Sequence, residues 1–78
     1  MARDPLDAAL LRAHAASDLP GLVALYTQAA DRAEAAGGID AACFYLTQAL
    51  VFALEDGAPV AMVLNRRLVA HGRADPIS

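Results

Sequence analysis

The chain has 78 residues, with six arginines, no lysine and nine acidic residues, which gives a net charge of −3. This length allows one small domain over residues 1–78, and the negative charge offers no general attraction for nucleic acid. Hydrophobic residues make up 58% of the chain, but twenty are alanine, so the composition favours helices. Cys43 has no partner for an internal disulfide and no secretion signal is recognised, so we expect a cytoplasmic protein.

Four segments have apolar residues that recur at three- and four-residue steps, which is typical of amphipathic helices. The predicted helices span about residues 5–16, 20–36, 39–55 and 59–71. No segment alternates strictly between apolar and polar residues, so we predict an all-α fold, a four-helix antiparallel array. A loose tail is expected over residues 73–78.

The third predicted helix is the most apolar part of the chain. Its main stripe should face the second helix, but Phe44, Val51 and Phe52 lie off this stripe. The apolar run that contains them is shorter than the roughly 20 residues that a membrane-spanning helix needs, so we expect no membrane association. We predict that these three residues form an interface with a second copy of the chain, as a homodimer or larger oligomer.

Part of the chain resembles a tetratricopeptide repeat. The family's large aromatic, its small residues and its turn glycine have counterparts at the family's spacing in Tyr26, Ala30, Gly37, Ala42, Leu46 and Ala49. The resemblance covers about residues 5–72, or about one and a half repeats, and implies an array of helical hairpins. Ala33 and Asn65 depart from the motif, which leaves a simple four-helix bundle as the alternative.

The resemblance also implies a function. First helices of such repeats line a concave face, and the corresponding residues expected to touch a partner are Thr27, Asp31, Glu34, Met62, Arg66 and Val69. The expected function is a protein–protein interaction module that binds a peptide or helix of a partner protein. The alternative is a structural or regulatory homo-oligomer without a peptide ligand.

No residue pattern predicts an enzyme, a bound metal or a cofactor. His14 and His71 have no neighbouring ligand at metal-binding spacing, and Cys43 lies in an apolar helix, so we interpret all three as structural residues. The aspartates that border the predicted helices are interpreted as caps. They are Asp4, Asp18, Asp40 and Asp56.

Cationic residues cluster at the end of the fourth predicted helix. The cluster comprises Arg66, Arg67, Arg73 and His71. Cations at a helix C-terminus stabilise the helix dipole, which is our interpretation of this cluster. The alternative is that it meets an anionic group on a partner.

Overall fold

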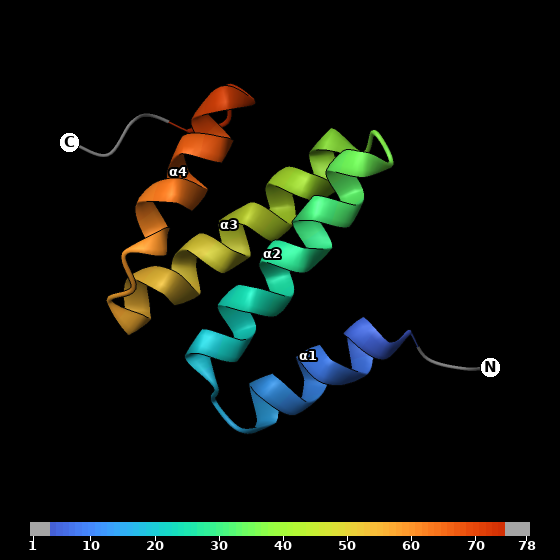
Figure 1. Cartoon of the computed structure of the whole chain (residues 1–78), viewed down its shortest axis with the longest axis vertical. Coiled ribbons are helices and arrows are strands. Elements are labelled where there is room, and N and C mark those ends of the chain that lie inside the picture. Colours follow the sequence, from blue (N-terminus) through green and yellow to red (C-terminus); the bar gives the residue numbers. More distant parts are fainter. Residues whose placement is uncertain (1–3, 75–78) are drawn as a thin grey trace.

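The computed structural model describes residues 4–74, and in this part of the chain all regular structure is helical. The helices are α1 (Pro5–Ala15), α2 (Leu19–Ala35), α3 (Ile39–Asp56) and α4 (Val60–Ala70) (Figure 1). Each helix begins and ends within one residue of the predicted position. The protein is therefore an all-α, four-helix array.

The helices form an open array rather than a closed bundle. Each helix contacts its neighbour in the sequence, and no two α-carbon atoms of non-consecutive helices lie within 8 Å of each other. In Figure 1, α1 and α4 lie on opposite sides of the α2–α3 pair, and the molecule measures 41 × 30 × 12 Å. A simple four-helix bundle would bring its first and last helices together around one core. The bundle alternative is therefore wrong.

The α2–α3 hairpin is the centre of the fold. Ala30, Ala42 and Ala49 have no exposed surface, and short side chains of this kind let two helices approach closely. Leu46 of α3 and Leu64 of α4 are the largest fully buried side chains, and both belong to one core cluster. Burial of these residues determines which sides of α3 and α4 face each other.

Two of the four predicted aspartate caps are present. Asp4 Oδ1 accepts a hydrogen bond from the Leu6 amide at 2.8 Å, and Asp18 Oδ1 accepts one from the Gly21 amide at 3.0 Å. The interpretation is wrong for Asp40 and Asp56. Gly38 is the N-cap of α3, Asp40 lies inside its first turn, and Asp56 is the last residue of that helix.

The segment after α4 is held more firmly at its start than predicted. The Arg73 amide donates to the Leu68 carbonyl at 2.9 Å, and the Arg73 guanidinium pairs with Asp40 at 2.6 Å. Ala74 packs against the core cluster. The prediction of a loose tail is therefore wrong for residues 73 and 74, and residues 75–78 lie outside the described part of the chain.

Candidate functional site

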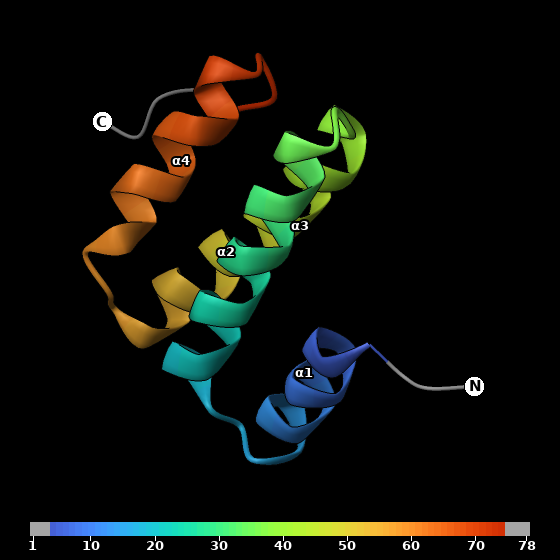
Figure 2. The ribbon, with the colours of Figure 1, turned by 45° about the vertical axis from the view of Figure 1, so that its right-hand side comes forward.

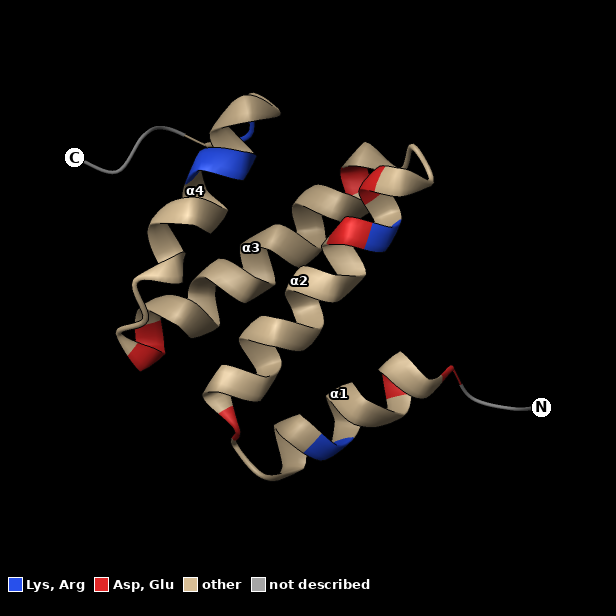
Figure 3. Ribbon diagram, in the orientation of Figure 1, with Lys and Arg blue, Asp and Glu red and all other residues tan. Residues whose placement is uncertain are grey.

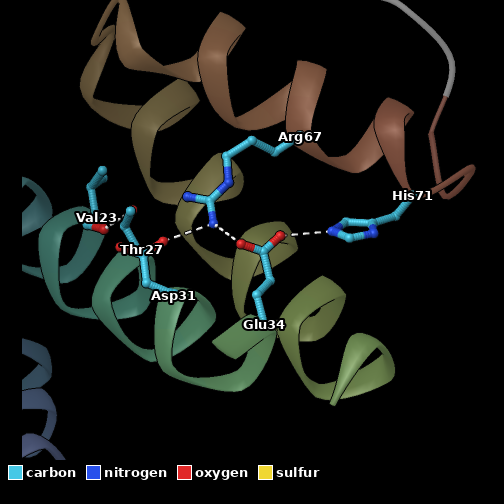
Figure 4. A network of polar contacts seen from close by, with 6 residues as sticks. All are labelled: Val23, Thr27, Asp31, Glu34, Arg67 and His71. Atoms are coloured by element: carbon cyan, nitrogen blue, oxygen red, sulfur yellow. Dashed lines mark hydrogen bonds and ion pairs between the residues drawn. The ribbon is translucent and has the colours of Figure 1, made fainter. Parts of the chain in front are cut away.

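An ion-pair network joins α2 to α4, although no α-carbon atom of one helix lies within 8 Å of an α-carbon atom of the other (Figure 4). Arg67 Nη2 of α4 lies 2.7 Å from Asp31 Oδ1 and 2.6 Å from Glu34 Oε1, both on α2. His71 Nε2, at the end of α4, lies 2.7 Å from Glu34 Oε2. We refer to these four residues as the α2–α4 bridge. The bridge holds the C-terminal ends of two parallel helices together.

The bridge changes the acid–base properties of its members. Hydrogen bonds from His71 and then from Arg67 hold the pKa of Glu34 below its ordinary value. Burial lowers the pKa of Arg67, but its hydrogen bonds to Glu34 and Asp31 outweigh this effect, and the pKa is raised overall. Glu34 is therefore a carboxylate and Arg67 a cation at neutral pH.

The bridge uses the α2 residues that the sequence assigned to partner binding. Asp31 and Glu34 pair with the chain's own α4, and the Thr27 hydroxyl donates to the Val23 carbonyl at 2.7 Å (Figure 4). The sequence identified the acidic residues but missed their partners, Arg67 and His71. The basic cluster is therefore, in part, the other half of an internal ion-pair network.

The α4 residues predicted to bind a partner together with Asp31 and Glu34 are not members of the α2–α4 bridge. Met62 and Arg66 are exposed and Val69 is half-buried. Because each residue turns a helix by about 100°, they point roughly 150° away from Arg67 and His71 around α4. These three residues therefore lie on a different side of α4 from the residues of the bridge. We refer to Met62, Arg66 and Val69 as the α4 flank.

The predicted interface on α3 is present only in part. Phe44 and Val51 are 57% and 43% exposed. Phe52, in contrast, stacks on Tyr26 of α2, with ring centroids 5.8 Å apart and an angle of 13° between the planes. Its position three residues after Ala49 places it on the α2 side of the helix. The prediction that Phe52 lies off the stripe facing the second helix is therefore wrong.

A cleft lies along α1: one of its two hollows is lined by α1 and α2, and the other by residues of α1, α2 and α3. Figure 2 shows α1 beside the lower part of α2, on the side away from α4, and two hollows of about 590 and 350 Å³ have residues of α1 and α2 in their linings. Asp7 borders both hollows, so we describe them together as the α1–α3 cleft. The first is lined by Asp7, Leu10, Leu11, His14 and Tyr26. The second is lined by Asp4, Leu6, Asp7, Ala29, Arg32, Ala33, Ala41 and Tyr45.

Aromatic side chains close one end of the cleft. His14 Nε2 lies 2.9 Å from the Tyr26 hydroxyl, and the His14 ring meets Phe52 edge-on at 5.7 Å. Tyr26 and Tyr45 have ring centroids 6.3 Å apart and connect the two hollows. The sequence did not predict this role for His14. The signal in the sequence is that His14 follows Leu10 by four residues, which places it at the border of the apolar stripe of α1.

Charged residues lie near the two ends of α3 and are absent from its middle (Figure 3), whereas Asp4, Asp7 and Arg32 line the second hollow of the cleft. At one edge, Asp4 Oδ1 lies 3.5 Å from Arg32 Nη1. Asp7, in contrast, takes part in no ion pair within residues 4–74. The cleft therefore presents apolar side chains next to one acidic group. Such a surface suits an apolar segment that carries a cation.

Within residues 4–74, no three His, Cys, Asp or Glu side chains are placed to hold a metal ion. The described helices also include none with the length and apolar character needed to cross a membrane. No protein-family model, curated protein or solved structure matches this chain.

Proposed function

We propose that this chain is a protein–protein interaction module that binds a helix or peptide of another chain in the α1–α3 cleft. The observation that supports it best is the composition of the cleft. Leu11 is 53% exposed next to Tyr26, and Asp7 is without an ion pair in the described residues. An amphipathic segment would bury its apolar side chains there and place a cation against Asp7.

A tetratricopeptide-like architecture is part of this proposal. Its support is the antiparallel order of consecutive helices and the burial of Ala30, Ala42 and Ala49 between two of them. The proposed binding surface differs from the concave face of that family. The α2–α4 bridge already uses Asp31 and Glu34, so the cleft on the other side of α2 is the better candidate.

The test compares two variants that add a carboxylate at equally exposed apolar positions. Leu11→Glu changes the cleft, and Phe44→Glu, the matched control, changes the outer side of α3. Each tagged protein is crosslinked in its native cells and purified, and the attached chains are identified by mass spectrometry. We expect Leu11→Glu to lose the attached chains and Phe44→Glu to keep them. Retention of the same chains by Leu11→Glu would refute binding in the cleft.

A second candidate function is a structural or regulatory homo-oligomer that buries the outer side of α3. It is supported by Phe44 and Val51, which are exposed and lie seven residues apart on the same side of the helix. Sedimentation equilibrium of the wild type and of Phe44→Glu tests it. Loss of a wild-type dimer in the variant supports this interface, and a wild-type monomer at about 100 µM contradicts it. Phe52 is unsuitable for this test because it packs on Tyr26.

A further inference from the structure

The two end helices of the array have fewer neighbours than the central hairpin. The α-carbons of α1 come within 8 Å of those of α2 but of no other helix, and those of α4 approach only α3. Both end helices also present large apolar side chains to solvent. Leu11 of α1 is 53% exposed and Met62 of α4 is 58% exposed. Exposed apolar side chains therefore occur at both ends of the array, as they do on the outer side of α3.

These two ends have complementary charges. In the α1–α3 cleft Asp4 pairs with Arg32, which leaves Asp7 as the acid without an ion pair among the described residues. On α4, Arg67 is held by Asp31 and Glu34, whereas Arg66 has no ion pair within residues 4–74. Among the charged residues that the structure describes, an acid without an ion pair thus lies among the apolar residues of one end, and a cation without an ion pair among those of the other.

The spacing of these residues also matches. Asp7 and Leu11 are four residues apart on α1, and Met62 and Arg66 are four residues apart on α4. This separation corresponds to about 6 Å along a helix and places both members of a pair on one side. The charge comes first in the α1 pair and second in the α4 pair. The two pairs therefore meet charge to charge and apolar to apolar when the helices run antiparallel.

We propose that the α4 flank of one copy docks antiparallel to α1 in the α1–α3 cleft of a second copy. Arg66 pairs with Asp7, and Met62 packs next to Leu11 and Tyr26, where its sulfur contacts an aromatic ring. This inference rests on the proposed function, because it identifies the chain that occupies the same cleft. The second copy would also cover the half-buried Val69 of the flank.

The two surfaces in this contact are different, so the association is head-to-tail. Each added copy leaves one free cleft and one free α4 flank, and the assembly continues until it closes into a ring. A two-fold dimer through Phe44 and Val51 would stop at two copies instead. The size distribution of the assembly therefore distinguishes the two modes of self-association.

Charge reversal tests the contact directly. We expect the wild type to form species larger than a dimer in sedimentation velocity at about 100 µM and low salt. Asp7→Arg and Arg66→Asp should each weaken association by roughly tenfold or more, because like charges then meet in the contact. The double variant should restore association, as should an equimolar mixture of the two single variants. Arg12→Asp, which carries the same net charge as Arg66→Asp, is the matched control and should assemble like the wild type.

All substituted residues are exposed, and circular dichroism establishes that each variant is helical. A monomeric wild type, or single variants that assemble like the wild type, would overturn the inference. So would a double variant that stays as weak as the single variants. These outcomes leave the cleft available to a different chain, and the crosslinking comparison of Leu11→Glu with Phe44→Glu then decides the proposed function separately.

Discussion

Two pairs of helices in this array are separated by one intervening helix, and they are joined in different ways. Charged side chains connect α2 to α4 through the α2–α4 bridge. Between α1 and α3, the His14 ring meets Phe52 edge-on, and the smaller hollow of the α1–α3 cleft opens beside Ala41 and Tyr45 of α3. Long charged side chains are able to bridge the space between two helix backbones that are not in contact. The shorter alanine and leucine side chains are not. The cleft is consequently where we propose that a partner chain binds.

The largest expected effect comes from a substitution in the hairpin that supports both pairs. Ala49→Leu should lower the free energy of unfolding by about 1–3 kcal/mol, because Ala49 has no exposed surface and a larger side chain forces α2 and α3 apart. Urea unfolding followed by circular dichroism measures the change. Ala24→Leu, at an exposed position of α2, is the matched control. An unchanged urea midpoint for Ala49→Leu would show that this interface tolerates a larger side chain.

A smaller effect is expected when the α2–α4 bridge is broken. Glu34→Gln removes the charge that Arg67 and His71 share, and it should cost about 1 kcal/mol, since the pair is partly exposed and screened by solvent. Asp40→Asn, which breaks the exposed pair with Arg73, should leave the urea midpoint unchanged. Equal effects of the two substitutions would mean that the bridge is no stronger than a surface ion pair.

The bridge should also make stability depend on pH. The pKa of Glu34 is lowered in the folded chain from its ordinary value of 4.5, so its contribution is complete above that pH. The contribution is lost as the pH falls through the lowered pKa, because the folded carboxylate then takes up its proton. The difference in urea midpoint between the wild type and Glu34→Gln should therefore shrink as the pH falls below about 4.5. A difference that stays constant down to pH 3 would contradict this linkage.

The helices could be predicted from the sequence because their boundaries depend on neighbouring residues. Asp4, Asp18 and Gly57 act within a few positions of the helix ends that they determine. The α2–α4 bridge could not be predicted in this way, since Arg67 and Asp31 are 36 residues apart. Whether Arg66 or Arg67 faces α2 depends on the rotation of α4 about its own axis.

That rotation is set by packing between helices. Leu64 and Leu68 are buried against the core, and their burial turns Arg67 and His71 toward α2 and the α4 flank away from it. The repeat motif assigned the opposite side of α4 to the concave face. The position of Phe52 has a similar origin, because the side of α3 that faces α2 is wide enough to include it as well as Tyr45.

The smallest expected effect concerns the contact of α1 with its neighbours. Tyr26→Phe removes the hydroxyl that lies 2.9 Å from His14 Nε2 but keeps the ring stacked on Phe52. A hydrogen bond at an exposed histidine contributes about 0.5–1 kcal/mol at most. Because Ala13 is the one buried residue of α1, this helix should open locally without the rest of the molecule. The substitution should therefore speed amide hydrogen exchange in α1 and leave the urea midpoint unchanged.

Glu34→Gln provides the matched comparison for hydrogen exchange, because it loosens the other end of the array. We expect Tyr26→Phe to speed exchange in α1 but not in α4, and Glu34→Gln to do the reverse, since each contact holds one end helix. Exchange that rises equally in all four helices of Tyr26→Phe would show that α1 unfolds only together with the hairpin. The aromatic contact of His14 with Tyr26 and Phe52 would then join α1 to the core as firmly as the bridge joins α4, and the difference between the two pairs of helices would lie in their surfaces alone.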